Sequence, residues 1–552
     1  MIPHRRADCV AIHAAMEARP ILSANDTLAR PAGHGPTART FRAVERAFDR
    51  PFGPAANPLR QLGALSFHFF WIVVVSGTYV YVFFDTSVEG AYHSVEALTV
   101  EQWWAGGVMR SVHRYASDAF VVTMVLHVVR EFAYGRFRGF RWFSWLSGVP
   151  LLWLAVASGV TGYWLVWDEL ALFVAVGTTE WFGWLPGFGP ALVRNFLTDE
   201  AMSDRFFSLL VFLHIGVPLL LLLGMWVHTQ RITRPHTTPD ASLGWGALGM
   251  LVLLSLVRPA VSLAPADLAR VPASIPLDWF YLAGYPLIYE WSPSALWLLA
   301  AAATFALAML PWATLAKRPP VVKVDLANCN GCGRCFADCP YGAVVMKPRT
   351  DGKPHARQAV VLDDLCASCG ICAGACPSST PFRRTDRLAT GIDLPQFQVG
   401  ELRARLEDAL ARMSGESKVV VFGCDCAADV RALAGPGVAA FSLPCAGMLP
   451  PSFVDYALRD GADGVLVTGC PPFDCAYRWG AQWTVERLSG AREPHLRASV
   501  PKERLRIHWA AAEDLAALGR ELARFRSELA SAPSRPVAAV ARAARRSEAG
   551  HG

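Results

Sequence analysis

Charged residues are scarce in this chain: Asp, Glu, Lys and Arg make up 18% of 552 residues, whereas 53% are hydrophobic. Outside the apolar runs the chain has no Gly-x-Gly-x-x-Gly dinucleotide fingerprint, and it lacks a Cys-x-x-Cys-His haem attachment motif, a Rieske-type Cys/His pair and a molybdenum or nickel constellation. Any chemistry that oxidises a soluble substrate is therefore expected in a partner protein. The composition predicts a membrane protein that carries soluble domains.

An early apolar core is missing too. Residues 1–60 carry nine arginines, so they do not read as a cleaved signal peptide. Loops on the N-terminal side of the apolar runs are richer in Arg and Lys than the opposite loops, and the positive-inside rule then places both termini in the cytoplasm. The arginines and lysines of these loops explain the net charge of +6. The sequence shows no nucleic-acid-binding motif that would explain it instead.

Long hydrophobic runs are present in the first part of the chain. Each is close to the length of about 20 residues that crosses a hydrocarbon core. The six predicted spans are 65–84, 114–133, 147–167, 207–228, 242–259 and 294–315.

Two of these spans carry histidines with identical spacing. His113 and His127 are 14 residues apart, and so are His214 and His228. In a helix, 14 residues fall about 40° short of four turns and rise about 21 Å, so both histidines of a pair face one side near opposite membrane surfaces. Two such helices offer two stacked bis-histidine sites for haem iron. Four unrelated membrane histidines would not share this spacing.

Glycines repeat the same period in the neighbouring spans. Gly63 and Gly77 precede the first histidine pair, and Gly148 and Gly162 lie between the two pairs. Because glycine lets a flat group approach the backbone, a porphyrin edge at each level would explain all four. Small-residue helix packing is the alternative, but it does not explain the shared period.

From about Gly53 to Pro311 the sequence resembles cytochrome b of the cytochrome bc and b6f complexes. The motifs are Arg110-Ser-Val-His113-Arg114-Tyr115, His127-Val-Val-Arg130, Gly162-Tyr163 and Arg205-Phe-Phe. The resemblance implies that His113 pairs with His214 at an outer haem and His127 with His228 at an inner one. It also implies that Arg110 and Arg130 neutralise haem propionates, and that the protein is a homodimer.

The loop 259–293 contains Ile275-Pro-Leu-Asp278-Trp279-Phe280-Tyr281, which resembles the family's Pro-Glu-Trp-Tyr quinol-site motif. Asp278 stands in the glutamate position, and beside the aromatic pair Trp279 and Phe280 it could shuttle a quinol proton. An interfacial aromatic belt with an incidental Asp is the alternative. His236 and Asp240 lie in the region where the resemblance implies ligands of an inner quinone site, but no motif aligns them with particular residues of the family.

Beyond Pro319 a cysteine pattern appears twice. Cys-x2-Cys-x2-Cys-x3-Cys-Pro begins at Cys329 and again at Cys366, as in bacterial ferredoxins with two [4Fe–4S] clusters. Zinc sites are the rival explanation, and the predicted cytoplasmic location excludes disulfides. In the two-cluster pattern, three cysteines of one run share a cluster with the fourth of the other. The predicted ligands are Cys329, Cys332, Cys335 and Cys376 for cluster one, and Cys366, Cys369, Cys372 and Cys339 for cluster two.

Short apolar strands are predicted near 418–422, 437–441, 464–468 and 505–509, alternating with helices at 452–460, 476–488 and 512–529. This order predicts a small doubly wound α/β domain. Cysteines fall at the carboxyl ends of three of these strands, where such folds place ligands. A structural set of thiol-rich loops is the alternative to a metal centre there.

Residues 417–530 resemble the delta subunit of methyl-viologen-reducing hydrogenases through Phe422-Gly-Cys424, Pro444-Cys445-Ala-Gly447 and the run from Gly461 to Cys475. The resemblance implies a [2Fe–2S] cluster and a flavin-bearing partner. Our choice of ligands is Cys424, Cys445, Cys470 and Cys475, with Cys426 as the extra cysteine.

The predicted organisation is a multidomain chain: an α-helical transmembrane bundle with a four-helix haem core, a ferredoxin-like α+β domain and a small α/β domain. The predicted segments are 1–52 (basic, cytoplasmic), 53–318 (membrane), 319–382 (ferredoxin), 383–415 (linker), 416–530 (delta-subunit-like) and 531–552 (disordered tail).

We therefore expect a multi-pass subunit of the cytoplasmic membrane with its iron–sulfur domains on the cytoplasmic side. It would carry electrons between a soluble flavin- or NAD-linked oxidoreductase and membrane quinone. The cofactors would be one [2Fe–2S] cluster, two [4Fe–4S] clusters and two b haems. Alternatives are quinol oxidation that feeds a cytoplasmic acceptor by bifurcation, a proton-motive quinol oxidase that feeds a cytochrome c, and a redox sensor without turnover.

Overall fold

A computed structural model describes residues 35–186, 189, 203–270, 272, 274–278, 281–313, 319–385 and 388–531. The chain separates into two compact parts. The helical unit comprises Gly35–Thr314, and the sheet unit contains Leu315–Gly552. Trp279, Phe280 and the predicted tail beyond residue 531 lie outside the described residues.

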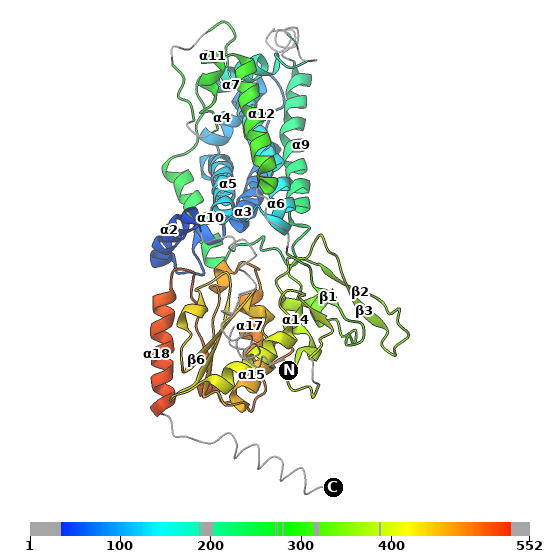
Figure 1. The fold of residues 1–552 in the computed structure, drawn as a ribbon. Coiled ribbons are helices and arrows are strands. Elements are labelled where there is room, and N and C mark those ends of the chain that lie inside the picture. The colour runs from blue at the N-terminus through cyan, green and yellow to red at the C-terminus, as the bar shows by residue number, and fades with distance from the viewer. Residues whose placement is uncertain are drawn as a thin grey trace, which may run out of the picture. The chain divides into compact units, whose positions relative to one another are not determined.

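Two pairs of long helices form the centre of the helical unit. Helix α3 (Leu62–Phe83) packs along α5 (Val108–Ala133), and α6 (Trp142–Val166) packs along α9 (Asp204–Thr229). The histidines lie on α5 and α9, and the glycines on α3 and α6. Figure 1 labels all four helices. Each pair thus combines one histidine helix with one glycine helix.

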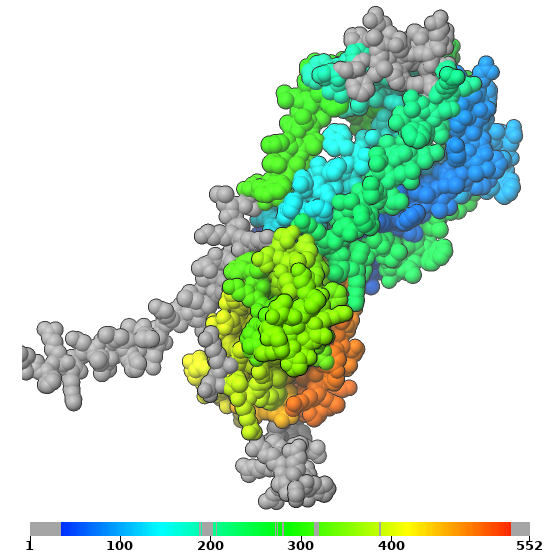
Figure 2. Space-filling view, turned by 90° about the vertical axis from the view of Figure 1, so that its right-hand side faces the viewer, coloured from blue at the N-terminus to red at the C-terminus, as the bar shows by residue number. Residues whose placement is uncertain are grey.

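Within the residues that the structure describes, four segments are long and apolar enough to cross a membrane: Leu62–Phe83, Gly139–Val166, Phe207–Thr229 and Pro293–Trp312. Large apolar side chains on α9, among them Phe212, Leu219 and Trp226, are exposed to the surroundings, as a lipid-facing helix requires. Figure 2 looks onto the face along which α9 runs. The other two predicted spans correspond to α5, which carries several charges, and to the 17-residue α10 (Ala241–Val257). Six spans therefore remain a prediction.

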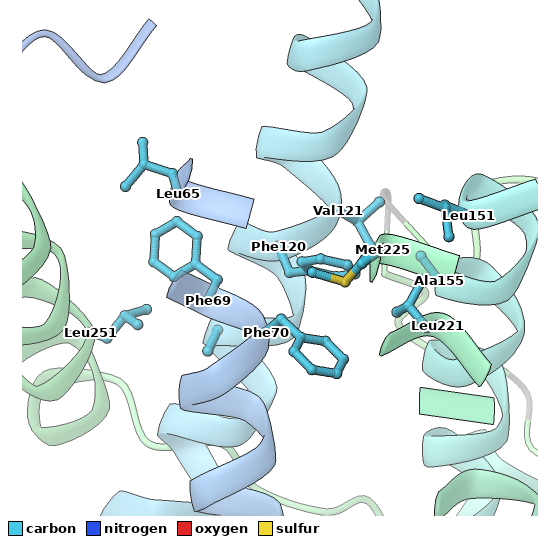
Figure 3. Close-up of a cluster of buried hydrophobic side chains, with 11 residues drawn as sticks. Leu65, Phe69, Phe70, Phe120, Val121, Leu151, Ala155, Leu221, Met225 and Leu251 are labelled. Carbon is cyan, nitrogen blue, oxygen red and sulfur yellow. The ribbon is translucent and has the colours of Figure 1, made fainter. Parts of the chain in front are cut away.

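An apolar layer fills the middle of the bundle. Phe70, Phe120, Ala155 and Leu221 are all buried in one hydrophobic cluster, and each lies seven residues from both members of its glycine or histidine pair. Figure 3 shows this cluster, in which Phe70 and Phe120 have ring centroids 6.1 Å apart. The layer separates the two histidine levels.

Shorter helices of the helical unit were not expected from the apolar runs. They are α4 (Gly90–Val100), α7 (Glu169–Phe182), α11 (Tyr285–Glu290) and the amphipathic α2 (Pro36–Phe52). The last predicted span, in contrast, is found as helix α12 (Pro293–Met309). Helix α2 is fixed through Glu45, which is fully buried and accepts hydrogen bonds from Arg130 Nε at 2.7 Å and Tyr134 Oη at 2.6 Å. These partners explain how a carboxylate can be buried there.

The sheet unit begins with two small antiparallel sheets. Strand β2 (Val344–Pro348) pairs with β3 (Arg357–Val361), and β1 (Lys323–Val324) pairs with β4 (Ile392–Asp393). Strand β4 and helix α15 (Val399–Arg412) lie within 383–415, which was predicted as a linker. Buried Leu402, Leu406 and Leu410 give this polar segment a packed helical face.

Four parallel strands form the second part of the sheet unit. They are β5 (Val419–Cys424), β6 (Val438–Leu443), β7 (Gly464–Val467) and β8 (Leu505–Ile507), in the order β6-β5-β7-β8. Helices α16 (Ser452–Arg459), α17 (Gly480–Ser489) and α18 (Leu515–Ser531) alternate with them. The buried strand residues pack against α18 through Leu518, Leu522 and Phe525. Cys424, Cys445 and Cys470 follow the carboxyl ends of β5, β6 and β7, where the sequence placed them.

Candidate haem and iron–sulfur sites

His113 on α5 and His214 on α9 face each other across the bundle. Their ring centroids are 6.3 Å apart, with the ring planes at 72°. An imidazole nitrogen binds a metal at about 2 Å, and the ring centre lies about 1 Å behind that nitrogen, so two imidazoles on one iron separate their centres by about 6 Å. The pair therefore has the spacing that one haem iron requires. His127 and His228 form the second level, close enough for their charges to interact.

Hydrogen bonds orient three of the four rings. Nδ1 of His113 donates to the Val73 carbonyl at 3.0 Å, and Nδ1 of His214 donates to the Ser158 carbonyl at 3.1 Å. His228 Nδ1 lies 3.0 Å from Ser147 Oγ. A proton on Nδ1 leaves the lone pair of Nε2 available, as metal-binding histidines require.

Each of the four glycines lies against one histidine ring. A methyl group at Gly77 would come within 2.6 Å of His113 Cε1, and one at Gly162 within 2.9 Å of His214 Cε1. The same addition at Gly63 or Gly148 would meet His127 or His228 at an ordinary 3.5 or 3.4 Å. The glycines thus make room for the imidazoles, and the predicted approach of a porphyrin edge stays a prediction.

The two arginines predicted to bind propionates have protein partners. Arg110 contacts Glu96 at 3.1 Å, Ser262 at 2.7 Å and Thr99. Arg130 contacts the buried Glu45, as described above. Binding of propionates by these arginines stays a prediction.

Asp278 lies at the level of the His113 pair, in a cluster with α5 and α6. Its Oδ2 accepts hydrogen bonds from Arg114 Nη2 and Tyr163 Oη, both at 2.5 Å, and Arg114 also pairs with Asp118. Tyr281 hydrogen-bonds to Ser117 Oγ at 2.8 Å, and its ring centroid is 6.2 Å from that of Tyr163. Among the described residues, Tyr163 is an aromatic partner of Asp278, whereas Trp279 and Phe280 lie outside the described residues.

The ferredoxin-type cysteines lie in two neighbourhoods, each of which includes one cysteine from the other run. Cys339, Cys366, Cys369 and Cys372 line one cavity, although Cys339 comes from the first run. Cys376, from the second run, is the strongest electrostatic neighbour of Cys335, ahead of Cys332 and Cys329. Within the described parts of the chain, no three His, Cys, Asp or Glu side chains form a site for a single metal ion.

The backbone around these cysteines suits an anionic cluster. Gly331, Gly333 and Gly370 have φ values of 67°, 77° and 75°, and Ser368 has a φ of 54°. These left-handed residues alternate with the cysteines and turn N–H groups inward, as in anion-binding nests. Backbone N–H groups reach two of the sulfurs: Ala343 N lies 3.2 Å from Cys339 Sγ, and Ser368 N lies 3.5 Å from Cys366 Sγ.

Burial disfavours the thiolate form of the more deeply placed cysteines when no cation is bound. It raises the pKa of Cys335 to about 12, and the neighbouring cysteines add to the effect. It also raises the pKa of Cys372 well above its ordinary value. Bound iron would supply the positive charge that stabilises the thiolates.

All five later cysteines line one further pocket, together with Ala446, Ala476, Tyr477 and Ala481. The Sγ atoms of Cys424 and Cys470 are 3.5 Å apart. Gly480 packs against two other cysteines, because a methyl group there would come within 2.2 Å of Cys445 Sγ and 3.5 Å of Cys475 Sγ. Cys426, predicted to be the extra cysteine, lies in the same pocket, so the choice of four ligands stays open.

Paired histidines between apolar helices, in a chain that also gathers cysteines in its sheet unit, define a membrane cytochrome joined to iron–sulfur domains. The family model "Cytochrome b/b6/petB" matches residues 48–235, "4Fe-4S dicluster domain" matches 328–380, and "Methyl-viologen-reducing hydrogenase, delta subunit" matches 418–531. The chain belongs to the cytochrome b/b6 family.

Similar proteins include three named cytochrome b6, each aligned with 33% of this chain and 84% of its own length. Those of Tupiella akineta and Chlamydomonas reinhardtii are 31% identical over 185 residues, and that of Bigelowiella natans is 32% identical over 188. A chain of a solved "Hyperthermophilic respiratory Complex III" is 20% identical, with a TM-score of 0.38, over 46% of this chain and 74% of its own. The protein is a membrane electron-transfer protein of the cytochrome b type with iron–sulfur domains.

Sequence reasoning missed the hydroxyl residues beside the haem sites. Three of the four glycines directly follow a hydroxyl side chain, in Ser76-Gly77, Ser147-Gly148 and Thr161-Gly162. Each of these hydroxyl groups lies within 3.3 Å of a histidine Nδ1. The recurring hydroxyl–glycine dipeptide could have predicted these hydroxyl–histidine contacts from the sequence.

Proposed function

We propose that this protein carries electrons between a soluble cytoplasmic flavin- or NAD-linked oxidoreductase and the membrane quinone pool, with net reduction of quinone. The observation that carries the proposal is the His113–His214 pair, spaced for one iron, in a chain that also groups its cysteines in three sets. Bound haems and iron–sulfur clusters supply one-electron oxidation and reduction.

The residues of this chain would hold those groups in the following way. His113 with His214 and His127 with His228 would bind two b haems. Two four-cysteine sets would bind [4Fe–4S] clusters, and four of the five cysteines in the last pocket would bind a [2Fe–2S] cluster. With six spans and both termini in the cytoplasm, the sheet unit would face the cytoplasm.

Asp278 supports a quinone site at the level of the His113 pair. Quinone reduction needs protons where the electrons arrive. Asp278 Oδ2 is shared by the Arg114 guanidinium and the Tyr163 hydroxyl, so the group that would carry the proton is held at a fixed position. Arg114 also contacts Asp118, so one cation faces two carboxylates.

Electron exchange with quinone tests the proposal. Purified full-length protein is reduced with dithionite, freed of excess reductant and mixed with a soluble quinone analogue. We expect the haem absorption bands and the iron–sulfur EPR signals to be reoxidised together, with quinol as product. A protein that stays reduced in the presence of quinone would instead support a redox sensor without turnover. Rapid reduction by quinol coupled to a cytoplasmic acceptor would support the opposite direction.

A further inference from the structure

The sheet unit packs its two cysteine-bearing parts closely against each other at a contact lined by glycines. A methyl group at Gly374 of α14 (Ile371–Ala375) would come within 2.3 Å of the Gly447 carbonyl oxygen. One at Gly447 would come within 3.1 Å of both Gly480 Cα and Ile371 Cγ1. Backbone therefore meets backbone between the ferredoxin-type segment and the loop that follows β6.

Two cysteines from different sets lie at this junction. Cys369 and Cys445 belong to one buried cluster with Ile371 and Trp483, all between 0% and 8% exposed. Their thiols are close enough to influence each other electrostatically. Cys369 lines the cavity of the set Cys339, Cys366, Cys369 and Cys372, whereas Cys445 lines the five-cysteine pocket.

The other ferredoxin-type set is more exposed. Cys332 is exposed and Cys329 is partly exposed. Phe336, one residue after Cys335, exposes 53% of its surface. The set Cys329, Cys332, Cys335 and Cys376 thus has a side open to an external redox partner, whereas Cys366, Cys369 and Cys372 are buried.

One guanidinium group holds the junction together. Arg487 of α17 is 1% exposed and pairs with Asp338, the residue before Cys339. Its Nη1 also donates to the Gly447 carbonyl at 2.7 Å, two residues after Cys445. Arg492 adds a second bond to Asp338 at 3.0 Å. A buried ion pair survives only with such additional hydrogen bonds, and it fixes the relative position of both cysteine sets.

Building on the proposed function, we propose that the five-cysteine pocket exchanges electrons with the set Cys339, Cys366, Cys369 and Cys372, across the buried junction that holds Cys445 and Cys369. The set Cys329, Cys332, Cys335 and Cys376 is then the far, exposed end of the relay. Each step moves one electron, so that one centre is oxidised as the next is reduced. No bond forms or breaks, and no proton moves. Arg487 is a positioning residue for this transfer.

The order is tested by EPR on dithionite-reduced, full-length protein. A nearby paramagnetic centre speeds the relaxation of the five-cysteine centre and raises the microwave power that half-saturates its signal. We expect Cys369→Ser to lower this power several-fold and Cys332→Ser to leave it within twofold of the parent value. The reverse pattern would overturn the proposal.

A second variant leaves every cysteine in place. Arg487→Lys keeps the charge but loses the forked contact, so at unchanged iron content the half-saturating power should fall. Arg405→Lys, on the exposed side of α15, is the matched control and should behave as the parent. If Arg487→Lys leaves relaxation unchanged while dithionite-reduced protein still reduces quinone, the proposed order is wrong and the proposed function stands.

Discussion

Gly77 lies closer to His113 than Gly63 lies to His127, although the two glycines are 14 residues apart on the same helix. A methyl group at Gly77 would clash with His113 at 2.6 Å, whereas at Gly63 it would make an ordinary contact with His127 at 3.5 Å. Because an iron-bound imidazole cannot rotate away freely, the two positions differ in tolerance.

We therefore expect Gly77→Ala to lower the haem content from about two to about one per chain, whereas Gly63→Ala keeps both. Pyridine haemochrome analysis of the purified variants measures this directly. Equal loss of haem in both variants would show that haem binding depends on the spacing of the glycines and not on their contact with the histidine rings.

Asp278 combines a charge partner and a hydroxyl partner on one oxygen. Asp278→Asn would remove the group that carries the proton, and we expect electron exchange with quinone to slow by about tenfold while both haems and all clusters remain. Asp278→Glu restores the residue of the family motif and should keep substantial activity.

Asp267→Asn is the control for this prediction, because Asp267 is exposed in the same loop and accepts a hydrogen bond from the nearby Ala269 amide. Stopped-flow reoxidation by a quinone analogue gives the rates. If Asp278→Asn exchanges electrons at the parent rate, quinone meets the chain elsewhere, and the inner level is the next place to look.

Helix α2 is attached to α5 through the buried carboxylate of Glu45, and also by a hydrogen bond from Thr37 Oγ1 to the Ala133 carbonyl. Glu45→Gln keeps the shape and the hydrogen-bond acceptor but removes the charge that faces Arg130. Hydrogen bonds to charged groups contribute about 1.5–3 kcal/mol, so we expect a loss of stability near that size. Thermal denaturation followed by haem absorbance measures it. Glu290→Gln, on the exposed end of α11, should leave the midpoint unchanged.

Elements formed by long or short runs of apolar residues were predictable from the sequence. The positions of α3, α5, α6, α9 and α12 follow from apolar runs near the length of a membrane span, and the four parallel strands follow from short buried runs. Helices with one apolar stripe, such as α2 and α15, were missed, because their charged residues outnumber the few leucines or aromatics that pack. The contacts of Asp278 with Tyr163 and of Arg487 with Asp338 depend on tertiary packing over more than 100 residues, which no local pattern carries.

At the scale of the whole molecule, the cysteine sets predict a definite iron content. Two [4Fe–4S] clusters and one [2Fe–2S] cluster give about ten iron atoms per chain besides haem. Elemental analysis combined with the haem content checks this number. Stoichiometric zinc in place of iron would contradict the assignment of the cysteine sets.

The central claim is that one chain connects its cytoplasmic iron–sulfur centres to quinone through both haem levels. Rapid reoxidation of dithionite-reduced His127→Ala protein by a quinone analogue tests it most directly. The account predicts that this variant lacks the inner haem, that its outer haem is reoxidised at the parent rate, and that its iron–sulfur EPR signals persist at least about tenfold longer than in the parent. Iron–sulfur signals that disappear as fast as in the parent would contradict the account, because electrons would then reach quinone without passing through the inner level.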